Sequence, residues 1–266
     1  MSPNWLTFVR SYLSGRTMRV KVGNSLSTCC PVDSGVPQGS VLGPSLFLAC
    51  INEIADLNLK EHSRIILFAD DLALVHPLCS EDSVCQAQDD LNNLSSCIKD
   101  LGLKLNVGKC RYISVHHLSN AATSTSLTPP VFSIDGTPLE KVEEYKYLGI
   151  SIDDKLNFAK HTTTVVIRAK QIIGALSRAL RKWSTAKVLK SAFTSIALPV
   201  LFYAIESWYP PNITQQYQIE RVQKFAARLI SNNFSQASSY EQLLDAANLR
   251  PIYRQVAERR RLFGTV

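Results

Sequence analysis

Residues 35–44 read GVPQGSVLGP and residues 68–71 read FADD, and these two stretches carry most of what the chain reveals about its architecture. The first contains three glycines and two prolines and runs into an apolar stripe at helical spacing. This predicts a shaped loop followed by a helix that has Pro44 in its first turn. Because glycine has no side chain, a ligand can approach the backbone of such a loop, and Gln38 offers both a hydrogen-bond donor and an acceptor. This stretch is compatible with a ligand-binding loop and equally with a glycine-rich turn that binds no ligand.

Asp70 and Asp71 lie between two short apolar runs, Arg64 to Phe68 and Leu72 to Val75, which predicts a β-hairpin with the acids at or beside its turn. Adjacent carboxylates repel each other and an exposed turn tolerates them, so a plain Asp-Asp turn is one interpretation. A divalent-cation site is the other. Mg²⁺ prefers carboxylate oxygens together with substrate phosphates, and two such ions can stabilise the attacking and leaving oxygens of a phosphoryl transfer.

Apolar periodicity predicts the remaining helices and strands. Helical spacing occurs at residues 5–13, 44–57, 80–101, 158–180 and 186–208, the last with a kink near Pro199. Strand-like runs occur at residues 18–22, 103–105 and 111–115, and a further hairpin is predicted from residues 131–134 and 145–152 around Asp135-Gly136. Residues 117–130 have loop composition. A β-rich first part followed by a helical second part predicts the α+β class.

Charge is distributed unevenly along the chain, whose net charge is +7. Residues 35–154 carry eight bases and sixteen acids, whereas residues 155–205 carry nine bases and no acid. An acidic block followed by a basic block favours a metal or phosphate-chemistry centre beside an element that binds a polyanion. Uneven charge by chance is the alternative.

Seven cysteines without any CxxC spacing predict buried free thiols. Free thiols fit a reducing nuclear or cytosolic compartment, because a secreted chain would normally pair its cysteines. The apolar stretches are too short to span a bilayer, so we expect no membrane segment and a nuclear or cytoplasmic location. The Arg-containing, acid-free first 22 residues also have the composition of a mitochondrial transit peptide. They continue without a break into a predicted strand, which favours a structural helix.

Taken together and in order, the two stretches resemble the SGVPQGSVLGP and FADD blocks of the reverse transcriptase domain of non-LTR, LINE-like retrotransposons. Other segments resemble later parts of the same family, namely LKLN at residues 103–106 followed by Lys109-Cys110, YLGI at residues 147–150, the pattern of Asp153, Leu156 and His161, and residues 219–230. The resemblance implies a right-hand polymerase, with a palm that carries the catalytic hairpin and an α-helical thumb. It implies an RNA template, a DNA primer, deoxynucleoside triphosphates, and Mg²⁺ with Mn²⁺ as an alternative.

The resemblance also implies roles for individual residues of the palm. Asp70 and Asp71 would hold the metal, and Pro37, Gln38 and Gly39 would lie near the template and the incoming nucleotide. Lys109 would lie near the triphosphate as a proton donor to the leaving pyrophosphate, with a merely solvated lysine as the alternative.

Further residues would contact the nucleic acid. Tyr147, Leu148 and Gly149 would position the primer, with an ordinary buried strand as the alternative. Five bases would face the nucleic-acid backbone, although some of them are expected to be only solvated: Lys170, Arg178, Arg181, Lys182 and Lys187.

One departure from the family pattern concerns the family's first catalytic block, a strand with an Asp that binds both metals. Residues 1–34 contain a single acid, Asp33, which abuts the glycine-rich loop and does not match that block. The fingers and any endonuclease domain are not matched either. The expected organisation is therefore a partial palm at residues 1–152, a thumb at residues 153–208 and a helical tail at residues 209–266.

Two functions follow from this organisation. The first is a reverse transcriptase domain that is truncated and inactive by itself. The second is a non-catalytic remnant that binds nucleic acid. A structural protein unrelated to nucleic acid would require both motifs and the basic block to be coincidental.

Overall fold

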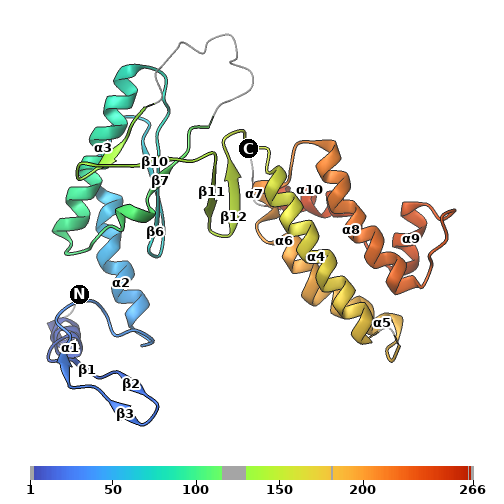
Figure 1. Ribbon diagram of the computed structural model, residues 1–266, viewed down its shortest axis with the longest axis horizontal. Coiled ribbons are helices and arrows are strands. Elements are labelled where there is room, and N and C mark those ends of the chain that lie inside the picture. The colour runs from blue at the N-terminus through green and yellow to red at the C-terminus, as the bar shows by residue number, and fades with distance from the viewer. Residues whose placement is uncertain (1–2, 116–129, 181, 263, 265–266) are drawn as a thin grey trace. The chain divides into compact units, whose positions relative to one another are not determined.

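The computed structural model describes residues 3–115, 130–180, 182–262 and 264, and the chain forms two compact units (Figure 1). The N-terminal unit comprises Met1–Cys110 and Thr125–Glu140, and the C-terminal unit comprises Arg111–Ser124 and Lys141–Val266. Both units contain helices and short antiparallel strand pairs. The α+β class is therefore confirmed.

The N-terminal unit contains three α-helices and several two-residue to five-residue strands. Its elements are α1 (Pro3–Leu13), β1 (Thr17–Met18), β2 (Lys21–Val22), β3 (Ser25–Leu26), β4 (Cys30–Pro31), α2 (Gly43–Ile51), the 3₁₀ helix η1 (Asn52–Asp56), β5 (Arg64–Phe68), β6 (Asp71–Val75), α3 (Glu81–Asp100), the 3₁₀ helix η2 (Val107–Lys109), β8 (Ser133–Ile134) and β9 (Thr137–Pro138). β10 (Glu140–Lys141) spans the junction between the two units. Antiparallel pairs join β1 to β4, β2 to β3, β5 to β6 and β8 to β9.

The N-terminal unit has a small apolar core where α2, η1 and α3 meet. The buried side chains are those of Ile51, Ile54, Leu94 and Ile98. Half-buried residues of the β5–β6 hairpin and of the segment after α3 pack around them: Ile65, Leu67, Leu72, Leu103 and Leu105. One core therefore anchors the helix that follows the glycine-rich loop and the hairpin that carries the acids.

Helix α3 has the capping residues that its sequence predicts. The Ser80 side chain accepts a hydrogen bond from the Ser83 backbone N–H, and the Ser83 hydroxyl accepts one from the Ser80 N–H, which satisfies two otherwise unpaired donors. Gly102 follows the helix with a φ of +70°, the left-handed conformation that glycine adopts at low cost. The predicted start and end of this helix are confirmed.

A buried acid on α3 closes the base of the β5–β6 hairpin. Asp90 is fully buried, and its carboxylate accepts hydrogen bonds from the Lys60 backbone N–H at 3.0 Å and from the Ser63 hydroxyl. The same hydroxyl lies 2.6 Å from Nδ1 of His76. Ser63 precedes β5 and His76 follows β6, so these groups tie both ends of the hairpin to the helix.

The single strand expected at residues 18–22 is wrong in detail, because β1 and β2 belong to two different strand pairs. Val20 lies between them and exchanges hydrogen bonds with Ser27, one of which goes to the serine hydroxyl at 2.9 Å. A side-chain acceptor in place of a backbone carbonyl interrupts the strand ladder at this point.

The C-terminal unit is mainly helical. Its elements are β7 (Arg111–Tyr112), β11 (Glu144–Tyr147), β12 (Ile150–Asp153), α4 (Ala159–Leu180), α5 (Ala186–Ala192), the π-helix η4 (Phe193–Ala197), α6 (Leu198–Phe202), α7 (Ile205–Trp208), α8 (Ile213–Ser231), α9 (Tyr240–Ala247) and α10 (Ile252–Leu262). β11 and β12 form an antiparallel hairpin.

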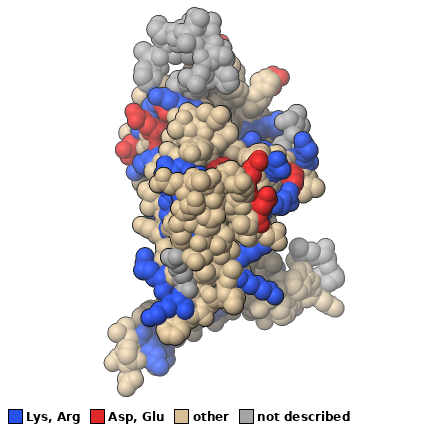
Figure 2. Space-filling view, turned by 90° about the vertical axis from the view of Figure 1, so that its right-hand side faces the viewer, with Lys and Arg blue, Asp and Glu red and all other residues tan. Residues whose placement is uncertain are grey.

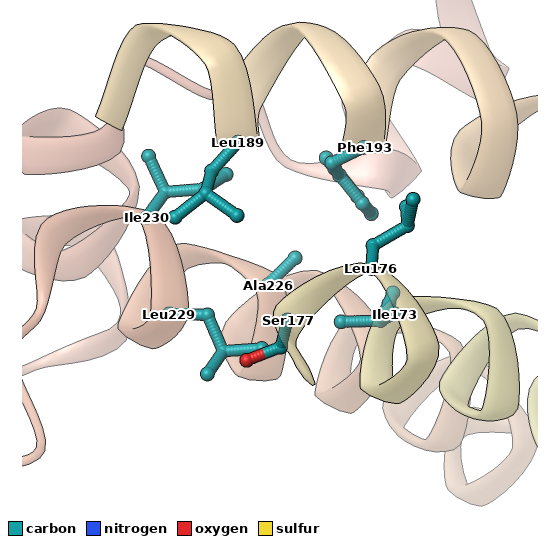
Figure 3. Close-up of a pocket in the computed structure, with 8 residues that line it drawn as sticks. All are labelled: Ile173, Leu176, Ser177, Leu189, Phe193, Ala226, Leu229 and Ile230. Atoms are coloured by element: carbon teal, nitrogen blue, oxygen red, sulfur yellow. The ribbon is translucent and has the colours of Figure 1, made fainter. Parts of the chain in front are cut away.

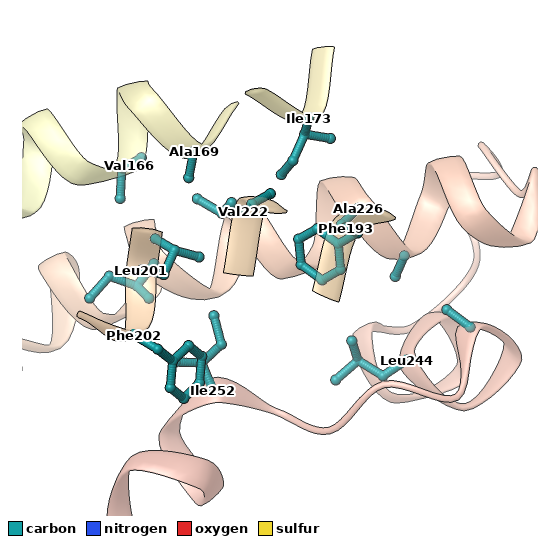
Figure 4. Close-up of a cluster of buried hydrophobic side chains, with 14 of the residues drawn as sticks. Val166, Ala169, Ile173, Phe193, Leu201, Phe202, Val222, Ala226, Leu244 and Ile252 are labelled. Carbon is teal, nitrogen blue, oxygen red and sulfur yellow. The ribbon is translucent and has the colours of Figure 1, made fainter. Parts of the chain in front are cut away.

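One apolar core joins all the longer helices of the C-terminal unit (Figure 4). Ala169 of α4, Leu201 of α6 and Val222 of α8 have no exposed surface, and Leu244 of α9 and Ile252 of α10 complete the same cluster. The predicted boundaries 153–208 for a thumb and 209–266 for a tail are therefore not those of the compact units. The segment after residue 208 supplies half of the core on which the preceding helices pack, and β11 and β12 belong to this unit as well.

The helix predicted at residues 186–208 is not continuous. Pro199 has no backbone N–H for the carbonyl four residues earlier, and the preceding turn widens into η4, where the Leu198 N–H bonds to the Phe193 carbonyl. Ala204 then takes a left-handed φ of +47° and separates α6 from α7. The helix is therefore irregular near Pro199, where a kink was predicted, but the predicted continuity to residue 208 is wrong.

Several cysteines are more exposed than the composition predicts. Cys29, Cys30, Cys79 and Cys85 are exposed thiols, so the expectation that the cysteines are buried is wrong for these four, which lie in loops and at helix or strand ends with little core beneath them. Within the described residues, the helices are too short or too polar to cross a membrane.

Candidate active site and nucleic-acid interface

The two acids lie at the tip of the β5–β6 hairpin. The strands pair in register from Arg64 opposite Val75 to Phe68 opposite Asp71, which leaves Ala69 and Asp70 as a two-residue turn. Both carboxylate residues are exposed to solvent. The predicted position of the acids at or beside a hairpin turn is confirmed.

The turn contains a residue in a costly conformation. Ala69 has a φ of +53°, in the left-handed region where the Cβ of an L-residue is crowded by its own backbone. Hairpin turns of two residues require such a φ because it matches the twist of the strands, and glycine, asparagine or aspartate usually supplies it. The alanine therefore keeps a tight turn directly before Asp70 at a cost of about 1 kcal/mol.

The donor set at this tip suits a hard divalent cation. Asp70 and Asp71 offer carboxylate oxygens on adjacent residues, and Mg²⁺ binds one or two protein carboxylates when substrate phosphates and water fill its other positions. Within the described part of the chain, no cluster of three or more His, Cys, Asp or Glu side chains has the arrangement of a metal site. These two residues therefore fit an ion that arrives with a phosphate-bearing ligand.

The glycine-rich loop is a turn built around its glycines. The Ser40 N–H bonds to the Pro37 carbonyl at 3.2 Å, and Gly39 has a φ of +77°, as the third position of a type II turn requires. A Cβ on Gly43 would lie 2.8 Å from the Ser40 Oγ and 2.9 Å from the Pro37 oxygen, so the chain passes itself too closely for a side chain. Gln38 lies at the exposed corner of this turn, where its amide faces solvent.

An arginine outside the motif holds the start of the loop. The Arg16 guanidinium donates to the Gly35 carbonyl at 2.5 Å through Nη2 and to the Leu13 carbonyl at 2.8 Å through Nε. It thereby joins the end of α1 to the loop. The sequence does not predict this contact, and the basic residues among positions 1–22 are the only signal that could have indicated it.

Lys109 ends the short helix η2, and its side chain is exposed. The segment that leads to it is anchored, because Leu103 and Leu105 pack against the apolar cluster that also holds Ile65 and Leu67 of β5. The lysine and the acids are thus carried by segments that share one core.

The segment predicted to position the primer is the tip of a second hairpin. Tyr147 pairs with Ile150, and Leu148 and Gly149 form a two-residue turn with φ values of +46° and +84°. Positive φ at both central positions is the signature of a type I′ turn. The hairpin expected between residues 131–134 and 145–152 is therefore wrong, since β8 pairs with β9 across Asp135-Gly136 and residues 144–153 fold as a hairpin of their own.

Of the bases predicted to face nucleic acid, Lys170 and Arg178 lie on α4, Lys182 follows that helix and Lys187 lies on α5. Arg178, Lys182 and Lys187 are exposed and Lys170 is half-buried, whereas Arg181 lies outside the described residues. The Lys182 ammonium lies 5.5 Å from the ring centre of Trp183, whose side chain is 83% exposed. Lys and Arg side chains cover more of the face drawn in Figure 2 than Asp and Glu do.

A small cavity in the C-terminal unit is not a candidate site. It has a volume of about 20 Å³ and lies between α4, α5 and α8 (Figure 3). Its lining is apolar except for Ser177, and a space of this size holds at most one water molecule. It is a packing gap between helices.

A family model described as reverse transcriptase (RNA-dependent DNA polymerase) matches residues 2–152. The chain belongs to the reverse transcriptase family. It is 29% identical over 235 residues to the probable RNA-directed DNA polymerase from transposon BS of Drosophila melanogaster, which covers 84% of this chain. It is 28% identical over 242 residues to the RNA-directed DNA polymerase from mobile element jockey of Drosophila funebris, which covers 86% of this chain.

This reverse transcriptase sequence spans about a quarter of the length of those two relatives. It is also 26% identical over 230 residues to a putative 115 kDa protein in the type-1 retrotransposable element R1DM of Drosophila melanogaster, which covers 83% of this chain. The prediction of a LINE-like reverse transcriptase domain is confirmed.

The pattern of Asp153, Leu156 and His161 has a structural explanation in this reverse transcriptase. The Asp153 carboxylate accepts backbone N–H groups from Lys155 at 3.1 Å, Asn157 at 3.0 Å and Phe158 at 2.7 Å. These bonds hold a loop in which Leu156 and Phe158 both have positive φ, at +51° and +54°. The aspartate therefore shapes the connection from β12 to α4.

His161 fixes the same connection from the helix side. Its Nδ1 accepts the Ser151 N–H at 3.3 Å, and its ring meets the Trp208 ring edge-on with centres 4.7 Å apart. Burial lowers the pKa of His161 below its ordinary value, with a smaller opposing influence from Glu144. The neutral ring is the form that can accept the Ser151 N–H.

Proposed function

We propose that this chain supplies the palm and the thumb of an RNA-directed DNA polymerase, within the N-terminal and C-terminal units respectively. The observation that carries the proposal is the shared core of the N-terminal unit. Ile51 of α2, Leu94 of α3 and Leu67 of β5 belong to one cluster, so the glycine-rich loop that leads into α2 and the acidic hairpin tip are held by the same packing. A template-directed active site needs such a fixed relation between its parts.

In this proposal the predicted site residues of the N-terminal unit act at the reacting end of the nucleic acid. Asp70 and Asp71 hold Mg²⁺, with Mn²⁺ as an alternative, and the bound ion supplies charge stabilisation for phosphoryl transfer. The turn at Pro37, Gln38 and Gly39 offers an exposed amide and an open backbone to the template and the incoming deoxynucleotide. Lys109 donates a proton to the leaving pyrophosphate.

The C-terminal unit would hold the primer–template duplex. Tyr147, Leu148 and Gly149 position the primer end, and the exposed bases bind the phosphate backbone without reading sequence. The exposed thiols of Cys29, Cys30, Cys79 and Cys85 suit a reducing nuclear or cytoplasmic compartment.

Primer extension on an RNA template tests the catalytic part of the proposal. Asp70 and Asp71 by themselves clamp two ions loosely, so we expect little extension by residues 1–266 and strong extension after an upstream reverse transcriptase segment with a third catalytic aspartate is fused to Met1. Asp70→Asn should abolish extension in the fusion protein. Asp100→Asn, at an exposed aspartate that ends α3, is the matched control and should leave it unchanged.

The outcomes of this experiment separate the two functions. Extension that depends on Asp70 supports the polymerase. Duplex binding without any extension, even in the fusion protein, would favour a non-catalytic nucleic-acid-binding role. Extension that survives Asp70→Asn would remove Asp70 from the metal site.

Salt dependence tests the thumb assignment. Each neutralised phosphate contributes about 0.7–0.9 to the slope of log K against log salt, so several contacts should give a steep slope. Charge reversal at Arg178, Lys182 and Lys187 should flatten it. Reversal of Lys60 and Lys99, which form ion pairs in the N-terminal unit, is the control. A slope that the triple reversal leaves unchanged would contradict the assignment.

A further inference from the structure

The turn at Leu148 and Gly149 is held by a side chain from a distant part of the C-terminal unit. The Tyr203 hydroxyl donates a hydrogen bond of 2.9 Å to the Leu148 carbonyl oxygen, across 55 positions of sequence. A Cβ built on Gly149 would lie 3.3 Å from Cε1 of the same ring. The ring therefore lies directly against the backbone of the turn, and Tyr203 contacts both of its central residues.

Tyr203 is itself held in place. Its carbonyl oxygen accepts a hydrogen bond of 2.8 Å from the indole nitrogen of Trp208, which is fully buried in the helical core. Tyr203 ends α6 in an extended conformation, and Ala204, with a left-handed φ, directly precedes α7. The core thus fixes the position from which the Tyr203 side chain reaches the hairpin.

Other groups hold β12 and the loop that follows it. Asp153 holds the loop at the base of the hairpin, and His161 accepts the N–H of Ser151, which lies one pair away from the turn. These contacts fix the position of β12, whereas Tyr203 hydrogen-bonds to the turn itself.

We propose that Tyr203 is a positioning residue for the primer terminus. It sets the location of the Leu148–Gly149 turn against which the last primer nucleotide rests. The inference depends on the proposed primer role of this hairpin. Tyr203 is 57% exposed, and a hydrogen bond in so exposed a place adds little to the stability of the fold, so its main effect is on the geometry of the tip.

The test compares two DNA–RNA duplexes bound by the full 266-residue chain, one with a recessed primer 3′ end and one with blunt ends. The variants are Tyr203→Phe, which removes only the hydroxyl, and Tyr203→Ala, which also removes the ring. Tyr217→Phe is the matched control, because it removes a phenol hydroxyl that is similarly exposed on α8 of the same unit. A photoreactive nucleotide at the primer 3′ end reports which residues touch the terminus.

We expect the unchanged chain to prefer the recessed end and to crosslink at residues 147–149. Tyr203→Phe should reduce that preference by about 3-fold to 10-fold, the range that one lost hydrogen bond produces, and Tyr203→Ala by at least as much. Affinity for the blunt duplex should change by less than about two-fold, and Tyr217→Phe should behave as the unchanged chain does.

Three results would overturn the inference, and they are distinguishable. If the unchanged chain prefers recessed ends and crosslinks at the hairpin, while both Tyr203 variants do the same, Tyr203 has no positioning role and the proposed function stands. A parallel loss of affinity for both duplexes in Tyr203→Phe would also reject positioning, because it indicates a general structural defect. If the unchanged chain shows neither preference nor crosslink, the primer role of the hairpin fails instead.

Discussion

Two hairpins with two-residue turns carry the most important predicted residues, and they differ in how their tips are supported. The β5–β6 tip contains Ala69 at positive φ, and among the described residues no side chain hydrogen-bonds to the carboxylates of Asp70 and Asp71. The β11–β12 tip contains Leu148 and Gly149 at positive φ, and Tyr203 holds it by a hydrogen bond and a ring contact.

The difference fits the two roles that we propose for these hairpins. Carboxylates that must bind an incoming ion and its phosphates cannot already be occupied by protein donors, so an unbraced and exposed tip suits them. A turn that only has to present backbone to a polymer works better when its position is fixed by the core. Both hairpins are also tied to helices, the first at its base through Asp90 and the second along β12 through His161.

The largest expected effect separates a metal ligand from a turn residue at the first tip. Asp70→Asn keeps the size and turn preference of the side chain but removes its charge. In the fusion protein that restores activity, we expect primer extension to fall by at least about 10²–10³-fold, as when one preorganised charge-stabilising group is lost. Single-turnover extension rates measure it. A change of less than ten-fold would mean that Asp70 serves only the turn.

The next effect concerns the β11–β12 turn, which Tyr203 holds. Gly149→Val places a branched side chain at a φ of +84° and against the Tyr203 ring, so it should destabilise the C-terminal unit by about 2–3 kcal/mol. Urea unfolding followed by tryptophan fluorescence measures the loss. In the Tyr203→Ala background the cost should shrink to the backbone part alone, and an equal cost in both backgrounds would show that the ring does not restrict Gly149.

Acid should weaken the attachment of β12 to α4 through His161. Burial lowers the pKa of His161 in the folded state, so the unfolded chain takes up a proton at a higher pH than the folded chain does. The contribution of His161 to stability is complete above about pH 6.5 and is lost as the pH falls below it, by up to about 1.4 kcal/mol per pH unit. Denaturation midpoints between pH 7.5 and 5.5 measure this. His161→Gln should remove that part of the pH dependence, and a variant with an unchanged profile would exclude His161 as its source.

The smallest effect tests backbone strain at Ala69 in the β5–β6 turn. Ala69→Gly relieves a positive φ at a gain of about 1 kcal/mol and adds some flexibility to the unfolded chain, so we expect a net stabilisation of about 0.5 kcal/mol. Ala73→Gly, within β6 of the same hairpin, should destabilise it. Equilibrium unfolding in urea compares the two. A destabilising Ala69→Gly would show that the hairpin supports its tip in a way that the contacts do not reveal.

Much of the first hairpin and of the glycine-rich loop could be predicted from sequence. The FADD turn, the helix that begins after the loop and the cap at Ser80 each depend on residues a few positions apart, and their chemistry is local. The turn of the second hairpin was not predicted, because YLGI at residues 147–150 has the composition of an apolar strand. Leucine rarely adopts the positive φ that Leu148 has, so this turn lacks its usual sequence signal.

Motif order and short-range turn and helix preferences are enough to predict the reverse transcriptase family, a mixed α and β fold, and the positions of Asp70, Asp71 and Gln38 at or beside turns. Which distant groups support these turns is visible only in the folded chain. The hydrogen bond of Ser63 to Asp90, the hydrogen bond of Tyr203 to Leu148 and the packing of α8, α9 and α10 into one core with α4 join residues at least 27 positions apart. The pattern of apolar residues shows that a helix face will be covered but not by which element, because apolar burial is nearly non-directional. The two hydrogen bonds form only after that packing has brought their partners together.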